Sequence, residues 1–476
     1  MIFAEPAFLY AFLPLLLLLY FLHPVVWYRN ALLLVFSLFF YTWGEGIYIL
    51  VMMASICWNY GFGLLIKRQN QLISSFAILT IGVIGNLFLL GFFKYTDFLV
   101  EMLNQLSGAF FTRLLINQPE IHLPIGISFF TFQSISYLVD VYRGHVSPQR
   151  SLLKLALYVS LFPQLIAGPI VRYETVASEL ETRKSTFSNF AHGIELFILG
   201  LARKVLIANP LGYCADQIFS LPVEQWSPGL CLLAITCYTL QIYFDFSGYS
   251  TMAIGLGKMF GFTFLENFDA PYTAQSIREF WRRWHISLST WFRDYVYVPL
   301  GGNRQGSYRT AANLLIVFFL CGLWHGAGLN FILWGLFHGA FLALERTRFG
   351  EFMSKRARIF QHLYVLGIVM TGWVFFRLES MNQILEFFRT IFFLGSMGTV
   401  IHPLERYLQR DVLIALCAGI ICSLNWKQIS QHSSFLLFER SRLRELSKVL
   451  CIIGLLLLCL IRLSAEQYNP FIYYRF

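Results

Sequence analysis

Apolar runs long enough to cross a hydrocarbon core recur along the whole of this 476-residue chain. Hydrophobic residues make up 57% of the sequence and charged residues only 13%, far from the balance of a soluble globular chain. A transmembrane helix needs roughly 17–25 mainly apolar residues, so we predict an all-α, polytopic membrane protein with about 10–13 membrane-embedded helices. Several runs are short, which favours some tilted or re-entrant helices. The candidate runs are 8–22, 32–43, 47–66, 73–93, 123–141, 152–170, 190–208, 230–256, 311–323, 331–344, 363–376, 412–424 and 449–463.

No internal repeat or long soluble linker interrupts this pattern. We therefore expect one integral-membrane domain over residues 1–476, with a core at 120–345 and auxiliary C-terminal helices at 346–476. Basic residues near the ends of spans mark the cytoplasmic side, which places Lys67 and the basic stretch 346–358 in the cytoplasm. Membrane lipid is an expected partner, since the basic stretches at 346–358 and 427–448 also suit anionic headgroups.

The stretch from Ser276 to Arg309 is the most unusual part of the chain, because six arginines alternate there with tryptophans. If it is helical, the i, i+4 and i, i+3 steps put Arg278, Arg282 and His285 on one face. Such a face suits an anionic ligand, such as the phosphates of a nucleotide-containing donor. An ion-pair network with Glu279 or Asp294 fits the same arginines equally well. The candidate donor-binding residues are Arg278, Arg282, Arg283 and Trp284.

Two histidines stand out. His325 lies inside an apolar run, and an ionisable residue at membrane depth is a functional-site hypothesis by default. The alternative is a neutral histidine that hydrogen-bonds to a neighbouring helix. His285 follows two arginines, whose like charge would lower its pKa and leave a neutral imidazole able to accept a proton. Its alternative is an interfacial histidine on an amphipathic helix. No HExxH, paired-carboxylate, phosphate-loop or GxSxG pattern is present, so no metal site is expected.

Five segments together resemble the membrane-bound O-acyltransferase superfamily, and most of all its bacterial alginate O-acetyltransferase branch. The resemblance implies a multi-pass enzyme of the bacterial plasma (inner) membrane, whose helices enclose a central tunnel. Such an enzyme passes acetyl groups from a cytoplasmic thioester, acetyl-CoA or another, to a polymer hydroxyl on the far side, with no bound cofactor. It also implies that the LWHG histidine, His325, is catalytic and that His285 is a second polar site residue. The segments are Leu123–Gly144, Leu161–Tyr173, Tyr243–Phe262, Asn267–Arg304 and Cys321–Gly339.

The aromatic sequence YNPFIYYRF, Tyr468–Phe476, is a separate signal. It is similar to the terminal motif of the small partner peptide in teichoic-acid D-alanylation, whose tyrosine has been considered an acyl acceptor. The matching residue is Tyr473, a possible acyl relay once a base removes its proton. The alternative is an aromatic anchor at the membrane interface. Expected partners are an extracytoplasmic acetyltransferase protein and a polysaccharide biosynthesis or export complex; no nucleic acid is expected.

The expected mechanism uses His325 as the general base for an incoming hydroxyl. His285 and the arginines would position the thioester carbonyl or the donor head group. Three alternatives stay open: D-alanyl transfer to teichoic acid, a non-enzymatic transporter, and a non-catalytic scaffold of an export complex. The polymer also stays open among alginate-like polymers, cellulose, peptidoglycan and other exopolysaccharides.

Overall fold

The structure is a computed structural model that describes residues 1–68, 74–110, 120–393, 402–426, 442–465 and 468–472. Within these ranges the regular structure is helical and contains no strand, which confirms the all-α prediction. Six helical stretches of this described part are long and apolar enough to cross a membrane, and two shorter apolar helices accompany them, Phe8–Leu22 and Leu329–Leu344. A polytopic membrane protein is therefore confirmed. The six stretches are Val26–Lys67, Ser75–Asn104, Pro228–Met259, Gly306–His325, Arg358–Arg377 and Glu445–Ala465.

The first of these stretches is divided by a turn. Gly46 has a φ of 54° and ψ of −120°, a conformation that only glycine adopts without strain. The helices before and after the turn contain 20 and 19 residues, so each is long enough to cross a membrane alone. The predicted number of membrane-embedded helices, about 10–13, stays a prediction, as does the central tunnel.

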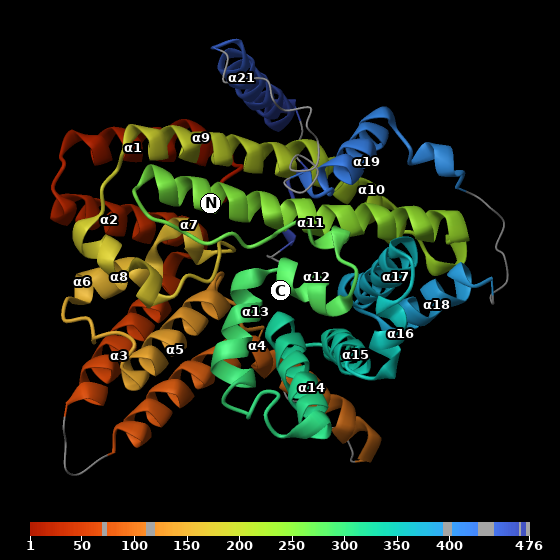
Figure 1. The fold of residues 1–476 in the computed structure, drawn as a ribbon, viewed down its shortest axis with the longest axis horizontal. Coiled ribbons are helices and arrows are strands. Elements are labelled where there is room, and N and C mark those ends of the chain that lie inside the picture. The colour runs from red at the N-terminus through yellow and green to blue at the C-terminus, as the bar shows by residue number, and fades with distance from the viewer. Residues whose placement is uncertain (69–73, 111–119, 394–401, 427–441, 466–467, 473–476) are drawn as a thin grey trace. The chain divides into compact units, whose positions relative to one another are not determined.

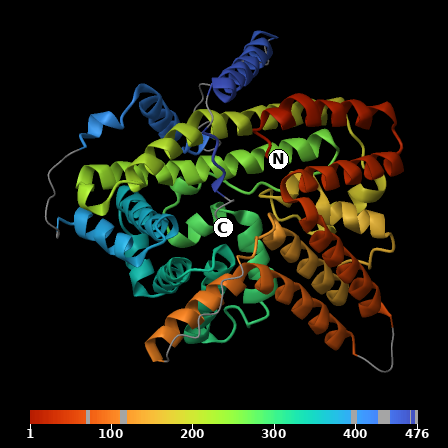
Figure 2. The same ribbon diagram turned by 180° about the vertical axis from the view of Figure 1, so that it is seen from behind.

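The chain forms two compact units, which are described separately. Unit 1 contains residues 1–193 and 256–265, and unit 2 contains residues 194–255 and 266–476. The predicted single domain, with its core at 120–345 and auxiliary part at 346–476, stays a prediction. Figures 1 and 2 show the helices of both units from opposite sides.

Unit 1 has an aromatic core. The rings of Phe8, Phe40 and Phe162 pack against one another with centroids 5.5–6.1 Å apart. The helices of the unit are η1 (Phe8–Phe12), α1 (Leu13–Leu22), α2 (Val26–Glu45), η2 (Gly46–Tyr48), α3 (Ile49–Lys67), α4 (Ser75–Phe110), α5 (Ile127–Arg143), α6 (Leu152–Ser160), α7 (Phe162–Leu165), α8 (Tyr173–Thr182) and the start of α9 (Phe187–Ala202).

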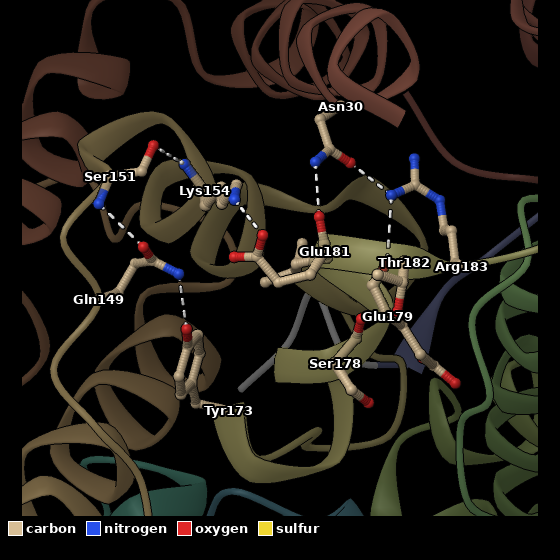
Figure 3. Close-up of polar contacts among 11 residues, drawn as sticks. Asn30, Gln149, Ser151, Lys154, Tyr173, Ser178, Glu179, Glu181, Thr182 and Arg183 are labelled. Carbon is tan, nitrogen blue, oxygen red and sulfur yellow. Dashed lines mark hydrogen bonds and ion pairs between the residues drawn. The ribbon is translucent and has the colours of Figure 1, made fainter. Parts of the chain in front are cut away.

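Side-chain hydrogen bonds fix α8 against α2 in unit 1, as Figure 3 shows. Asn30 of α2 donates to the Leu180 carbonyl at 2.8 Å and accepts from the guanidinium of Arg183. Arg183 is buried, and its Nε also donates to the Tyr20 hydroxyl at 3.1 Å. A buried guanidinium needs such partners, because it cannot shed its charge. We therefore assign this cluster a structural role.

Unit 2 contains the rest of α9 and every histidine and arginine that the sequence singles out as a candidate. Its helices are η3 (Arg203–Ala208), α10 (Asn209–Phe219), η4 (Val223–Gln225), α11 (Pro228–Met259, whose last residues belong to unit 1), η5 (Pro271–Thr273), α12 (Ile277–Arg283), α13 (Ile286–Phe292), η6 (Arg293–Tyr297), α14 (Gly306–His325), α15 (Leu329–Leu344), α16 (Arg348–Ser354), α17 (Arg358–Arg377), α18 (Met381–Ile391), η7 (Leu404–Arg406), α19 (Arg410–Cys422) and α21 (Arg442–Ala465).

Two glycines let α9 and α11 approach closely within unit 2, where both views show these helices side by side (Figures 1 and 2). A Cβ on Gly200 would lie 2.5 Å from the Gly248 carbonyl oxygen, and a Cβ on Gly248 would lie 2.8 Å from that of Gly200. Small residues at such crossings are typical of membrane helices, because they allow backbone contact. Directly after α9 the chain forms the π-helix η3.

We expect Gly200→Ala to destabilise the protein by about 1–3 kcal/mol, because the added methyl overlaps backbone atoms that cannot move aside. The thermal unfolding midpoint of the purified protein in detergent measures this effect. Gly454→Ala is the matched control, since a Cβ at Gly454 on α21 would meet nothing within 4 Å. Equal midpoints for Gly200→Ala and wild type would contradict the close approach.

Candidate functional site

A small buried cavity in unit 2 brings together the two histidines that the sequence predicts, and we call it the histidine pocket. Its volume is about 20 Å³, which is room for about one water molecule. His285 and His325 are 1% and 7% exposed. The other lining residues are apolar or aromatic: Ile242, Phe246, Trp284, Trp334, Trp373, Phe376 and Ile472.

The backbone breaks at His285, so this residue is not part of a helix. Helix α12 starts at the N-cap Ser276, whose side chain accepts from the Glu279 N–H, and ends at Arg283. His285 then takes the left-handed conformation, φ 43° and ψ 57°, before α13 begins. A positive φ is uncommon for a residue other than glycine and is typical of functional sites when the surroundings enforce it.

Two backbone hydrogen bonds hold this break in place. The Asp269 N–H donates to the Arg283 carbonyl at 3.0 Å, and the Ile286 N–H donates to the Asn267 carbonyl at 2.9 Å. The prediction that Arg278, Arg282 and His285 share one helical face is therefore wrong: the helix ends between the arginines and the histidine. His285 is buried in the pocket, whereas Arg278 and Arg282 are exposed.

The hydrogen bonds of Asn267 determine which nitrogen of His285 carries the proton. Asn267 Oδ1 accepts from the Ser287 N–H at 3.1 Å, which identifies it as the carbonyl oxygen of the amide. It lies 3.1 Å from His285 Nδ1, which must therefore donate. In the neutral ring Nε2 then keeps its lone pair, and it has no hydrogen-bond partner among the described residues. His285 presents a proton acceptor in the pocket.

Burial lowers the pKa of His285 to about 3. The direction agrees with the prediction, but the cause is loss of hydration and not the like charge of the preceding arginines. Arg282 extends to the surface, and Arg283 is ion-paired. The imidazole is therefore neutral near neutral pH, which a proton acceptor requires.

His325 is the last residue of α14, at the point where the chain breaks before α15. Its ring packs against Trp324, Trp334 and Phe376 with centroids 4.7–5.1 Å apart. The glycines around it serve close packing of α14 on α15: a Cβ at Gly322 would lie 2.4 Å from the Phe331 carbonyl oxygen. His338 of α15 contacts the same Trp334 but does not line the pocket.

The predicted donor-binding residues are divided between three environments. Arg278 and Arg282 are exposed, and within the described part of the chain neither side chain has a carboxylate partner. Arg283 donates to Glu279 at 3.0 Å and reaches Asp269 at 3.5 Å, as the ion-pair alternative expects. Trp284 is buried and lines the histidine pocket.

A second cavity of unit 2, which we call the polar cavity, lies beside Arg278 and has a volume of about 480 Å³. Its wall includes Ser276, Glu345 and Tyr364. The Glu345 carboxylate accepts from the N–H groups of Ile277 and Arg278 at 2.6 and 3.0 Å, so its charge is engaged by the start of α12. The Arg278 guanidinium is the cationic group in the wall of this cavity that is available to bind an anion.

Comparison with known proteins identifies the family of this chain. The model of MBOAT, the membrane-bound O-acyltransferase family, matches residues 145–381, which include both pocket histidines. A probable alginate O-acetylase AlgI of Azotobacter vinelandii is 38% identical over the full length of both chains. The chain belongs to the membrane-bound O-acyltransferase family. It is thus an O-acyltransferase and a multi-pass protein of the bacterial inner membrane.

Two further relatives differ in how much of the chain they cover. A peptidoglycan O-acetyltransferase of Helicobacter pylori is 36% identical and covers 81% of this chain and 79% of its own. A teichoic acid D-alanyltransferase of Bacillus subtilis is 30% identical but covers only 46% of this chain and 60% of its own. The likeness to the O-acetyltransferases therefore extends over far more of this acyltransferase.

Sequence reasoning missed three residues in or near the candidate site. Asn267, which orients His285, has no signal beyond its place in the motif block. Lys204 and Asp245 form an ion pair at 2.6 Å with both side chains only 2% exposed. Asp245 lies in an apolar run, so the rule that singled out His325 applies to it as well.

The catalytic and donor-binding roles that the sequence predicts for the site residues stay predictions. Tyr473 lies outside the described residues, so its role stays a prediction. Among the residues that the structure describes, no group of three or more histidine, cysteine, aspartate or glutamate side chains could hold a metal ion.

Because its folded pKa is lowered, His285 should make the acyltransferase acid-labile. Above the unfolded pKa of about 6.5, its contribution to stability is fully present. As the pH falls from there towards about 3, only the unfolded chain binds the proton, so the unfolding free energy falls by about 1.4 kcal/mol per pH unit. The measurement is the unfolding free energy of wild type and His285→Asn in detergent between pH 7 and 4. It should fall more steeply with decreasing pH in wild type. Parallel slopes would contradict the buried, neutral imidazole.

Proposed function

We propose that this acyltransferase moves acetyl groups from a cytoplasmic thioester to hydroxyl groups of an exported polysaccharide. The observation that carries the proposal is the histidine pocket, where His325 and the unprotonated Nε2 of His285 meet inside aromatic walls. The names of the relatives support acetyl groups and a cell-envelope polymer. The acceptor is alginate-like, cellulose, peptidoglycan or another exopolysaccharide.

The pocket suits acyl transfer to oxygen, because a thioester is already activated and needs mainly a base beside the acceptor. His325 takes the hydroxyl proton while the oxygen attacks the thioester carbonyl. The tetrahedral intermediate then expels the thiolate, which takes up a proton to leave as a thiol, and an oxygen ester remains. General-base help of this kind is worth roughly 10²–10⁴-fold in rate.

The tautomer of His285 narrows its role. Nε2 can accept a hydrogen bond but cannot donate one to a thioester carbonyl, so we revise the expected carbonyl contact. We assign His285 the task of accepting from an N–H or O–H group, either an amide of the donor or the acceptor hydroxyl. Asn267 and the backbone bonds around residue 285 hold the ring in place for this contact.

We assign the polar cavity and its surroundings to the donor head group, with acetyl-CoA as the proposed donor. Arg278 lines the cavity, and Arg282 is exposed four residues later on α12. Exposed guanidinium groups without carboxylate partners are suited to phosphate oxygens. Arg283 instead serves folding, through its bonds to Glu279 and Asp269.

The remaining proposals concern the path of the acetyl group. A cytosolic donor and an exported acceptor require a passage through the membrane, which the predicted central tunnel would supply. Tyr473 would act as an acyl relay; Ile472, the residue before it, lines the histidine pocket and supports this proposal. An extracytoplasmic acetyltransferase protein within a polysaccharide biosynthesis or export complex would complete the transfer.

The three alternatives to this function differ in how much support they have. D-alanyl transfer to teichoic acid is the weaker proposal, since the relative with that name matches less than half of this chain. Membership of an enzyme family overturns the two non-enzymatic alternatives, a transporter and an export scaffold.

His325→Ala should abolish acetylation of the exported polymer while the protein still accumulates in the membrane. The base is removed, and a small neutral side chain does not hinder insertion. The measurement is the acetyl content of the polymer from cells that produce equal amounts of wild type or variant. His145→Ala is the control, since it alters a half-exposed histidine that does not line the pocket. Near-normal acetyl content in the His325 variant would refute the proposed base.

Arg282→Gln and Arg283→Gln should behave differently although they are neighbours. A charged contact to phosphate is worth about 1.5–3 kcal/mol, so Arg282→Gln should raise the donor KM by roughly 10- to 150-fold with less effect on kcat. Arg283→Gln should reduce the amount of folded protein, since Glu279 and Asp269 lose their partner. Donor titrations on detergent-purified variants decide this. An unchanged KM in stable Arg282→Gln protein would exclude the donor contact.

A further inference from the structure

The buried pair of Lys204 and Asp245 does more than neutralise two charges. Lys204 lies on η3, which directly follows α9, and Asp245 lies on α11; Gly200 and Gly248 bring α9 and α11 into backbone contact. Removing both charges from water is costly, and the attraction between them offsets that cost only when their other hydrogen-bonding positions are also filled. The segment 468–472 fills one such position on each of the two side chains.

The ion pair binds the backbone of this segment at two points. The Lys204 ammonium donates to the Pro470 carbonyl. Asp245 uses one carboxylate oxygen for Lys204 and accepts from the Ile472 N–H with the other, at 2.9 Å. The positive ammonium therefore binds a backbone carbonyl, and the negative carboxylate binds a backbone N–H two residues further along the segment.

Further contacts fix the register of the segment 468–472. The Tyr468 hydroxyl donates to Asp216 at 2.7 Å, and Asn209 donates to the Tyr468 carbonyl at 3.4 Å. The Phe471 ring packs on Tyr249 with centroids 4.6 Å apart. Phe471 and Ile472 are 5% and 7% exposed, so this end of the segment is buried.

The segment also closes the histidine pocket. The other lining residues belong to helices of unit 2 or to the fixed break at Trp284 and His285, whereas Ile472 comes from this segment. A pocket of about 20 Å³ has no room for an acetyl thioester together with a hydroxyl acceptor. The segment contributes one wall of the pocket, and polar contacts to Lys204, Asp245 and Asp216 help to hold it there.

We infer that Lys204 and Asp245 are positioning residues that bind the segment 468–472 and set its place against the histidine pocket during acyl transfer. This inference rests on the proposed function. Docked, the segment keeps water away from the two histidines. Released, it exposes the thioester carbonyl to water, which attacks it to give acetate and the free thiol in place of an acetylated polymer.

A charge exchange tests the binding directly. The double variant Lys204→Asp/Asp245→Lys keeps an ion pair between the two helices, but it turns a carboxylate towards the Pro470 carbonyl and an ammonium towards the Ile472 N–H. A cysteine placed by Ile472→Cys reports docking through its rate of reaction with a maleimide, in a background without the exposed Cys57, Cys417, Cys422 and Cys451. Loss of two charge-assisted bonds should raise this rate about 10-fold or more.

The matched control exchanges a second ion pair of unit 2. Arg462 of α21 and Asp411 of α19 lie 3.7 Å apart, and this pair includes no residue of the segment 468–472. Arg462→Asp/Asp411→Arg should leave the labelling rate unchanged. If the exchanged Lys204–Asp245 pair does not fold, Lys204→Met/Asp245→Leu removes both buried charges together. It should give the same rise, since an apolar pair of similar volume is tolerated in place of a buried ion pair.

The functional measurement follows thiol release from acetyl-CoA and polymer acetylation in the same full-length variants. We expect thiol release to continue in the variants while polymer acetylation is lost. Unchanged labelling would overturn the inference, and so would faster labelling with normal polymer acetylation. Failure of the proposed function itself looks different: His325→Ala would then leave polymer acetylation intact.

Discussion

A charge inside the apolar helices of unit 2 has to be neutralised by the chain itself, because the surrounding lipid and packed side chains supply no water. Lys204 and Asp245 neutralise each other. The Lys204 ammonium and the Asp245 carboxylate each also bind the backbone of the segment 468–472. Arg377 and Asp216, whose side chains are 16% and 24% exposed, also form an ion pair, at 2.8 Å. The architecture of the site depends on this constraint, since it ties a segment far along the sequence to the helices that carry the pocket.

The same constraint explains how the two histidines differ. His285 has one ring nitrogen committed to Asn267, which fixes both the tautomer and the orientation of the ring. His325 lies at the end of α14, held by aromatic ring contacts. One ring is therefore fixed by a polar anchor and the other by packing. The roles that we propose, a positioned acceptor for His285 and a base for His325, rest on that difference.

The sequence predicted the fold class well, because apolar run length is a local property and needs no knowledge of contacts. It also singled out His325 and His285, which the structure places in one pocket, while their predicted roles stay predictions. Prediction from the sequence failed where a residue's conformation or contacts depend on residues that are distant in the sequence. The helical face through Arg278, Arg282 and His285 was wrong because bonds from residues 267–269 break the helix after Arg283. Arg283 differs from the exposed Arg282 by also reaching the carbonyl and carboxylate of Asp269, fourteen residues earlier, a contact that no local pattern predicts.

The tryptophans around the two pocket histidines have an optical consequence. The indole of Trp324 lies 4.7 Å from the His325 ring and 6.4 Å from the His285 ring, and Trp334 is 4.9 Å from His325 on another side. Protonated imidazole quenches a neighbouring indole far more strongly than neutral imidazole does. The pocket thus carries its own fluorescent reporter, so that a proton arriving on either histidine registers as a loss of tryptophan emission without any added label.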